Sequence, residues 1–486
     1  MSLNVLDALR RRFGDAQVLQ GAEAAPFEHD WRGQFPGRAL AVLRPRDVAE
    51  VQAMLRAAAA FALSVVPQGG NTGLVGGSTP DDSGQQLVLS LRRLNRVRAL
   101  SRDNLSLTAE AGCVLADLQA AAAAQGLLLP LSLAAEGSCT LGGNLATNAG
   151  GTQVLRWGNA RDLCLGLEVV TADGQVWSDL DGLRKDHRGF NLRDLFIGSE
   201  GCLGVITAGV MKLAPKPRSR LAAWITLRTL SDAMAVLAQA REAFAEGLSG
   251  FEAMGAEVQA LWDAPPLPTA PWAVLLELSS ADPEDVSRAR LEAFLGEELQ
   301  AGRLQNAVLS QSQAQFEALW ALREAIPEAQ TRAGGNLKHD ISLPLSALPA
   351  FCESAAQQLQ TLCPGLRPMV FGHLGDGNLH YNVAPPSGVT LAAFRQQHGD
   401  AITQIVFDAV AAHGGSFSAE HGIGRLRREE LGRRLDPVAL GLMRQIKQAL
   451  DPANRLNPGR VLPAEQPRAG ATAQPTNAGD DQRYCC

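Results

Sequence analysis

The sequence lacks the features that would place it in several large classes of protein. No apolar run approaches the roughly 20 residues that a membrane-spanning helix needs, and residues 1–14 lack the long apolar centre of a signal peptide. The net charge is −6 and no basic stripe is present, which argues against nucleic acid as a partner. The sequence therefore predicts a cytoplasmic protein without a transmembrane segment.

The cysteines form no recognisable motif, and lysines are few. The eight cysteines form no CxxC pair and no metal-finger spacing, so reduced and mostly buried thiols are expected. The final pair, Cys485 and Cys486, fits either a redox or anchoring device or a passive tail. Only five lysines occur among the 44 basic residues, which makes any lysine in a polar pocket a candidate functional residue.

What is present is ordinary globular material: 486 residues, 46% hydrophobic and 19% charged. This length exceeds what one hydrophobic core supports, so two or three domains are expected. Strand and helix signals and composition predict the following parts: an N-terminal helical segment at 1–38, a first domain at 39–217 with subdomains at about 39–100 and 101–217, a second α+β domain at 218–437, a terminal helix and closing segment at 438–462, and a disordered tail at 463–486.

Three glycine-rich loops lie in the first domain. They are PQGGNTGLVGG after an apolar strand, EGSCTLGGNLATNAGG at 136–151, and GSEGCLGVI at 198–206. Glycine has no Cβ, so consecutive backbone N–H groups can converge on phosphate oxygens. The first loop alone fits a plain surface hairpin equally well. The three together indicate a backbone that wraps around a long, phosphate-bearing ligand.

These loops resemble the FAD-binding domain of the vanillyl-alcohol oxidase superfamily, in which two α+β subdomains enclose an extended FAD. The resemblance spans roughly residues 39–215. It implies that the pyrophosphate is held by Gly69, Gly70, Asn71, Thr72 and Gly73. It implies that the rest of the flavin site is formed by Pro67, Gly137, Ser138, Gly142, Gly143, Asn144, Thr147, Asn148, Gly201, Ile206 and Asn457. Relatives with covalent FAD often carry a histidine in the first loop; Asn71 stands there, so non-covalent FAD is expected.

Two glycine-flanked segments in the second half concentrate histidine. In GHLGDGNLHYN, at 372–382, a turn between two short strands places His373 and His380 on facing strands. In SAEHGIG, at 418–424, Glu420 and His421 arrive from a separate loop. Two imidazoles and a carboxylate are a usual ligand set for zinc or a similar divalent ion, with positions left open for substrate. The alternative is a pair of core or surface histidines in a glycine-rich hairpin.

Both segments resemble the C-terminal domain of FAD-linked D-lactate, glycolate and D-2-hydroxyglutarate dehydrogenases. Together with the glycine loops, the similarity covers nearly the whole chain up to Pro463. The resemblance implies a divalent metal, expected to be zinc, on His373, His380 and Glu420. It also implies that Asn382 contacts the substrate carboxylate and that His421 accepts the proton. The expected fold class is α+β: a two-subdomain FAD-binding domain of the vanillyl-alcohol oxidase type plus an α+β substrate (cap) domain, with residues 438–462 returning to the FAD domain.

The segment LWALREAIPEAQTRAGGNLKHDISLP resembles the part of D-2-hydroxyglutarate dehydrogenases that grips the second carboxylate. The matching cations are Arg323 and Lys338, and Lys338 is expected to lead an apolar strand. A threonine often found four residues after the arginine is Pro327 here, which leaves room for D-malate or a monocarboxylate. The sequence thus predicts oxidation of a small D-2-hydroxy acid, D-2-hydroxyglutarate first and then D-malate or D-lactate.

Other interpretations stay open. One is the flavin subunit of a glycolate oxidase complex, and another is an electron-transfer module with no substrate of its own. The electron acceptor is expected to be an electron-transfer flavoprotein, a quinone or a cytochrome, and a homodimer is an expected assembly.

Overall fold

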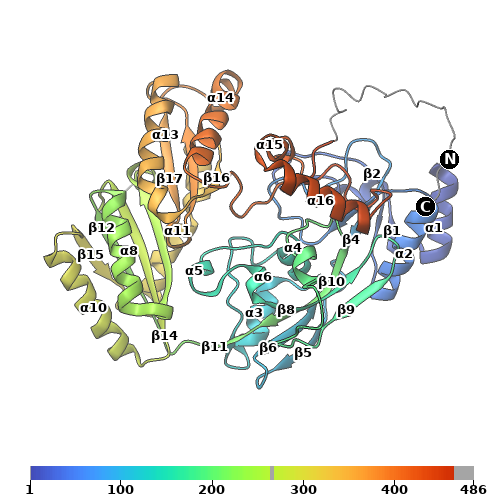
Figure 1. Ribbon diagram of the computed structural model, residues 1–486, viewed down its shortest axis with the longest axis horizontal. Coiled ribbons are helices and arrows are strands. Elements are labelled where there is room, and N and C mark those ends of the chain that lie inside the picture. The colour runs from blue at the N-terminus through green and yellow to red at the C-terminus, as the bar shows by residue number, and fades with distance from the viewer. Residues whose placement is uncertain (1, 263–266, 465–486) are drawn as a thin grey trace, which may run out of the picture.

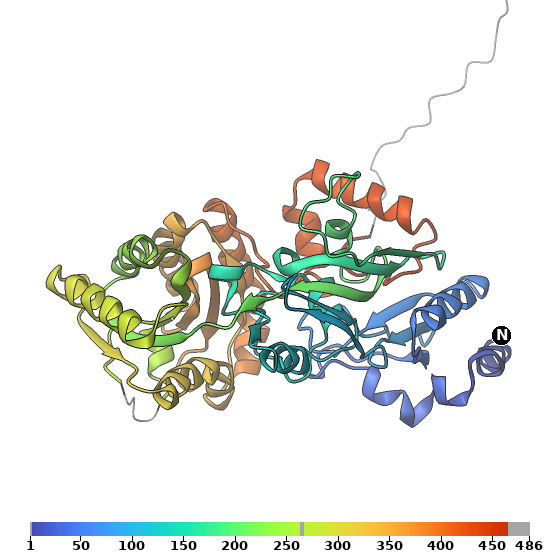
Figure 2. The same ribbon diagram turned by 90° about the horizontal axis from the view of Figure 1, so that it is seen from below.

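The structure is a computed structural model that describes residues 2–262 and 267–464. Figure 1 shows two lobes side by side, and the view turned by 90° in Figure 2 shows the same division. The first lobe holds the N-terminal residues together with the last helices, and the second holds the middle of the chain. The predicted tail at 463–486, with Cys485 and Cys486, lies almost entirely outside the described residues.

The first lobe begins with a four-stranded sheet in the order β1-β2-β4-β3. β2 and β3 both run parallel to β4, because α2 crosses over between them. The Asp47 side chain accepts from the backbone N–H of Glu50 and so caps α2. The elements are α1 (Ser2–Phe13), β1 (Val18–Leu19), β2 (Ala39–Leu43), α2 (Val48–Ala60), β3 (Val65–Gln68) and β4 (Gln86–Ser90), with short 3₁₀ turns at Asp15–Gln17, Gly21–Glu23 and Ala25–Phe27.

A five-stranded antiparallel sheet in the order β5-β6-β10-β8-β9 completes the first lobe. Its strands are β5 (Val97–Ser101), β6 (Ser106–Glu110), β8 (Cys164–Val170), β9 (Val176–Asp179) and β10 (Val205–Lys212). Its helices are α3 (Leu115–Ala123), α4 (Leu141–Ala146), α5 (Val154–Trp157), α6 (Ala160–Leu163) and α7 (Arg193–Phe196). The two-stranded ribbon of β7 (Leu127–Leu128) and β11 (Ala214–Pro215) lies where the chain leaves for the second lobe.

One of the three expected glycine loops is partly helical. Residues 141–146 form α4, and its glycines allow the helix to lie directly against the sheet. A Cβ added at Gly142 would lie 2.5 Å from the Cβ of Ala111, and one added at Gly209 on β10 would lie 2.8 Å from Leu145 Cδ1. Glycine therefore serves close packing here, which the sequence pattern alone does not distinguish from a ligand loop.

The second lobe is built on a seven-stranded antiparallel sheet in the order β15-β12-β14-β13-β17-β18-β16. Helices α8, α10, α13 and α14 cover one face, and α9, α11 and α12 cover the other. The strands are β12 (Ser219–Leu227), β13 (Leu248–Gly255), β14 (Trp272–Ser280), β15 (Asn306–Leu309), β16 (Asp340–Ser342), β17 (Arg367–His373) and β18 (Asn378–Ala384). The helices are α8 (Leu230–Phe244), α9 (Ala256–Gln259), α10 (Glu284–Gln300), α11 (Gln313–Glu324), α12 (Ile326–Arg332), α13 (Leu348–Leu362) and α14 (Leu391–Ala412), with 3₁₀ turns at Ala245–Gly247, Leu345–Ala347 and Leu374–Asp376.

The chain then returns to the first lobe through α15 (Arg428–Arg434) and α16 (Pro437–Leu450). Leu456 forms a parallel bridge with Val65 of β3, so the closing segment extends the first sheet. The expected α+β class is therefore confirmed. Within the described ranges, no helix is long and apolar enough to cross a membrane.

Candidate functional site

The glycine segments of the first lobe meet around a cavity of about 130 Å³. Twelve of the residues predicted for the flavin lie on its wall: Pro67, Gly69, Gly70, Asn71, Thr72, Gly73, Gly142, Gly143, Asn144, Thr147, Gly201 and Ile206. His421 of the second half of the chain lines the same cavity. The predicted flavin site and the predicted base thus belong to one space.

Four residues predicted for the flavin are not on this wall. Gly137 and Ser138 are exposed. The Asn148 side chain accepts from the Arg161 backbone N–H at 3.0 Å. The Asn457 amide donates to the carbonyls of Gly77 at 2.9 Å and Glu200 at 2.7 Å. In the structure Asn148 and Asn457 therefore hold neighbouring loops. Sequence reasoning missed other wall residues, among them Gln68, Ser78, Thr140 and Glu200, although each stands in a glycine segment or directly beside one.

The cavity wall fits an extended polar ligand such as FAD. Thr140 Oγ1 is buried there and has no hydrogen-bond partner among the described residues, and an unpaired buried hydroxyl is costly unless a ligand satisfies it. A Cβ at Gly69 would lie 2.3 Å from this oxygen, and a Cβ at Gly70 would lie 2.2 Å from the Ser138 carbonyl. Asn71 adopts φ +57° and directs its amide to the His29 carbonyl at 2.8 Å. At its two glycines, the first loop thus approaches its neighbours too closely for any side chain.

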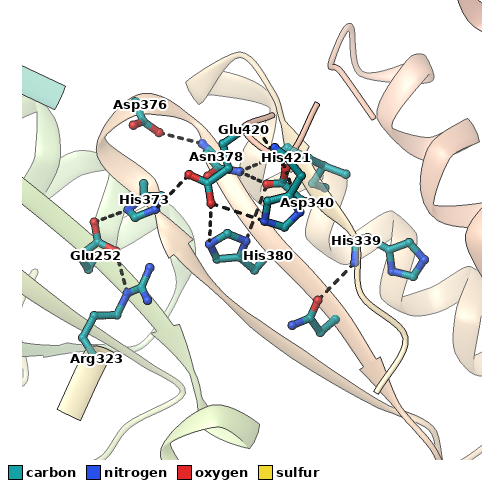
Figure 3. A network of polar contacts seen from close by, with 12 residues as sticks. Glu252, Arg323, His339, Asp340, His373, Asp376, Asn378, His380, Glu420 and His421 are labelled. Carbon is teal, nitrogen blue, oxygen red and sulfur yellow. Dashed lines mark hydrogen bonds and ion pairs between the residues drawn. The ribbon is translucent and has the colours of Figure 1, made fainter. Parts of the chain in front are cut away.

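A cluster of imidazoles and carboxylates lies at the edge of the second-lobe sheet (Figure 3). Gly377, with φ +87°, makes the turn between β17 and β18, and the ring centroids of His373 and His380 are 5.6 Å apart. The Glu420 carboxylate lies between three rings: its oxygens are 3.8 Å from His373 Nε2, 3.8 Å from His380 Nε2 and 3.7 Å from His421 Nε2. The structure therefore brings two of the predicted ligands, His380 and Glu420, into one group of potential ligand atoms, and places His373 beside that group.

Asp340 is a member of this cluster that sequence reasoning missed. Its Oδ2 accepts from the backbone N–H groups of Glu420 and His421, both at 3.0 Å, and lies 3.4 Å from His421 Nδ1. Asp340, His380, Glu420 and His421 each offer a ligand atom within 4.8 Å of the others. Asp340 begins β16, and the only sequence signal for it was an acid directly beside His339 at the start of an apolar strand.

Glu252, also missed, connects two predicted site residues from the centre of the sheet. It lies on β13, accepts from Arg323 Nε at 2.8 Å and is 2.7 Å from His373 Nδ1. Burial opposes the ionisation of Glu252, but His373 and Arg323 outweigh it and hold its pKa at about 2. Burial lowers the pKa of His373, but the Glu252 carboxylate beside Nδ1 outweighs it and raises the pKa to about 9, so Nε2, which is directed at Glu420, is protonated near pH 7. A metal on Nε2 would replace that proton, and Glu252 would then hold the other ring nitrogen, as metal-binding histidines usually require.

Burial sets the protonation of the remaining cluster. It lowers the pKa of His421 to about 4, although Asp340 acts in the opposite direction, and it raises the pKa of Glu420 to about 7 against the effect of His373. His380 is likewise shifted well below its usual pKa by burial. His421 and His380 are therefore neutral near pH 7, the state in which an imidazole accepts a proton or binds a metal.

The predicted substrate cations and Asn382 are placed differently from expectation. Lys338 lies two residues before the start of β16 and is exposed, so it does not lead an apolar strand. Partial burial of its ammonium group and the nearby Arg32 still lower its pKa to about 8. Asn382 is buried, donates to Gln330 Oε1 at 3.0 Å and accepts from the His339 N–H at 3.2 Å. Pro327 opens α12.

Comparison with known proteins supports the same two-part organisation. Residues 39–179 match the FAD binding domain family, and residues 216–461 match the C-terminal domain of FAD linked oxidases. A mitochondrial D-2-hydroxyglutarate dehydrogenase of Bos taurus is 40% identical over 94% of this chain and 83% of its own. A D-2-hydroxyglutarate dehydrogenase of Xanthomonas citri pv. viticola is 38% identical over 90% and 93%.

Solved structures show the fold. An alkyldihydroxyacetonephosphate synthase superposes with a TM-score of 0.71 at 17% identity, covering 94% of this chain and 84% of its own. A p-cresol methylhydroxylase superposes with a TM-score of 0.74 at 15% identity, covering 95% and 96%. The predicted vanillyl-alcohol oxidase type of fold and the prediction of FAD are therefore confirmed, whereas the cytoplasmic location stays a prediction. The chain belongs to the family of FAD-linked oxidases that includes the D-2-hydroxyglutarate dehydrogenases.

Proposed function

We propose that this protein oxidises a D-2-hydroxy acid, D-2-hydroxyglutarate first, to the 2-oxo acid by metal-assisted transfer of the Cα hydrogen to FAD. The observation that carries the proposal is that His421 belongs both to the His/Glu/Asp cluster and to the wall of the flavin cavity. Proteins with this named activity align with 90% or more of the chain. A flavin carrier without a substrate needs no such cluster beside its cofactor.

The cluster residues divide the work of binding and proton transfer. His373 and His380, through their Nε2 atoms, and Glu420 would hold the metal, while Asp340 fixes the backbone that carries Glu420 and His421. When bound, a divalent cation supplies positive charge that lowers the pKa of a nearby hydroxyl by several units. His421 accepts the hydroxyl proton at its Nε2 atom, since Asp340 lies beside its Nδ1 atom.

Bound FAD supplies the acceptor for the hydrogen and the electron pair from Cα. The glycine segments around Gly69, Gly142 and Gly201 would hold it along the cavity wall. Four cations, Arg32, Arg323, Lys338 and Arg427, act on groups of the cluster and favour an anionic substrate. Among them, Arg323 and Lys338 are proposed to bind the second carboxylate, and Asn382 the first.

A dye-reduction screen tests the proposed function. Purified enzyme is mixed with the D and L forms of 2-hydroxyglutarate, malate and lactate, with and without a chelator. Reduction by D-2-hydroxyglutarate that the chelator suppresses is expected. A preference for D-lactate or glycolate would favour the alternative family members, and no reduction by any hydroxy acid would favour an electron-transfer module. Electron-transfer flavoprotein, a quinone and a cytochrome are the proposed acceptors, and a homodimer is the proposed assembly.

The flavin is expected to be bound without a covalent link, because the Asn71 amide already bonds the His29 carbonyl and Ser78 and offers no nucleophile. Acid precipitation of the yellow protein should release its colour into the supernatant, which an absorbance spectrum measures. Colour that stays with the pellet after washing would contradict this expectation.

Lys338→Met is expected to impair oxidation of dicarboxylates selectively. A charged hydrogen bond to a carboxylate contributes about 1.5–3 kcal/mol, so kcat/KM for D-2-hydroxyglutarate or D-malate should fall roughly 10- to 100-fold, with little change for D-lactate. Lys216→Met, at another exposed lysine, is the matched control. Equal losses on both substrate types would show that Lys338 does not bind the second carboxylate.

A further inference from the structure

The loop at 418–424, which carries Glu420 and His421, is held by two carboxylates from opposite sides. From the second-lobe sheet, Asp340 Oδ2 accepts from the N–H groups of Glu420 and His421. From the first lobe, Glu200 Oε1 accepts from the Ile423 N–H at 2.7 Å and Glu200 Oε2 accepts from the Gly424 N–H at 2.9 Å. Hydrogen bonds to a carboxylate are stronger than those between neutral groups, so the loop is bound firmly to both lobes.

The Glu200 carboxylate fits closely between the two loops that it joins. A Cβ at Gly422 would lie 2.9 Å from its Oε1, and a Cβ at Gly77 would lie 3.1 Å from its Oε2. A Cβ at either place would push the carboxylate aside by a few tenths of an ångström. A one-atom change on either side therefore displaces the contact.

The backbone of Glu200 is itself fixed in an unusual conformation. Its φ is +51°, a region that few residues other than glycine adopt. The Asn457 amide donates to the Glu200 carbonyl, and the Glu200 N–H donates to the Ala146 carbonyl at 2.8 Å. Strained backbone of this kind persists where the surrounding structure determines it, and it gathers at functional sites.

Glu200 and His421 both lie on the wall of the flavin cavity. The N–H groups that Glu200 binds are only two and three residues beyond His421 in the chain. A movement of Glu200 therefore displaces the backbone that follows His421, and with it the imidazole relative to that cavity, while Asp340, His373 and His380 stay fixed on the strands of the second-lobe sheet.

We propose that Glu200 is a positioning residue, which sets the place of His421 over the flavin cavity by binding the backbone of Ile423 and Gly424. The inference rests on the proposed function for its catalytic consequence. Removal of the hydrogen from substrate requires the Glu200 contact, because a misplacement of about 1 Å costs on the order of 100-fold in rate. Transfer of electrons from reduced flavin to an acceptor does not require it.

Glu200→Gln tests the proposal, because the amide accepts from one N–H and directs its own NH₂ group at the other. In stopped flow, reduction of bound FAD by D-2-hydroxyglutarate should slow about 100-fold, with kcat changed more than KM. Reoxidation by a dye, FAD content and melting temperature should match the wild type. Glu50→Gln is the matched control, since Glu50 also accepts a backbone N–H, from Arg46 at 2.7 Å, but outside the cavity.

Two further measurements test whether the effect arises from the contact between Glu200 and the loop. Gly422→Ala reaches the same contact from the loop side and should reproduce the slow reduction with FAD retained. Trypsin cleavage after Arg425, measured without substrate, should accelerate in both variants and not in Glu50→Gln. Wild-type reduction rates, equal losses in both half-reactions, or loss of FAD from both variants would overturn the proposal. If the wild type oxidises no hydroxy acid but both variants are still cleaved faster, the proposed function is wrong, whereas the role of Glu200 in holding the loop is supported.

Discussion

Replacing His380 by alanine is expected to lower turnover of a D-2-hydroxy acid by at least about 1000-fold while the protein keeps its flavin. The His380 ring lies at the centre of the cluster, with Nε2 3.8 Å from Glu420 and Nδ1 3.7 Å from Asp340. Lewis-acid assistance contributes several kcal/mol to a barrier, and about 1.4 kcal/mol corresponds to a tenfold rate. His380 is absent from the wall of the flavin cavity, so the visible spectrum should survive.

The controls for this prediction separate metal loss from misfolding. His187→Ala removes an exposed histidine of the first lobe and should keep wild-type turnover. Metal content measured by mass spectrometry should fall in the His380 variant alone. Near-normal turnover in that variant, or in a wild-type sample stripped of all metal, would show that no metal takes part.

The parts of the site that could be predicted from sequence are those in which one short segment carries the chemistry. The loop that starts at Gly69 follows a strand, and its glycines expose the backbone to a ligand. The turn at Gly377 brings His373 and His380 close together. Both consequences follow from local geometry.

The parts that could not be predicted depend on residues far apart in the chain. Glu252 acts through His373, 121 residues later, and Asp340 acts through Glu420, 80 residues later. β13, which carries Glu252, is buried over its whole length and shows no alternating pattern. The exposure of Lys338 depends on where β16 begins, and strand ends are poorly fixed by sequence. A single sequence contains no signal for such pairings.

Glu252→Ala is expected to be the most destabilising of the substitutions considered, at about 3–5 kcal/mol of unfolding free energy. The carboxylate is 1% exposed and bridges the Arg323 guanidinium, whose side chain is 7% exposed, and the His373 ring. Its removal leaves a guanidinium without its anion in a low-dielectric site, where burying a charge is costly. Arg323 also stacks over the Phe371 ring at 5.0 Å, so it cannot leave without losing that contact.

A double-mutant cycle gives this prediction its sharpest form. In urea unfolding followed by circular dichroism, Glu252→Ala combined with Arg323→Met should be more stable than Glu252→Ala alone, because the second change removes the stranded charge. Glu328→Ala, which breaks an exposed pair with Arg332, is the control and should cost less than about 1 kcal/mol. Glu252 also orients His373, and loss of a residue that orients a metal ligand typically weakens metal binding roughly 10- to 100-fold. Both Glu252 variants should therefore bind metal more weakly by about that factor. A double variant as unstable as the sum of its parts, or a single variant with wild-type stability, would show that the Glu252–Arg323 pair is not coupled.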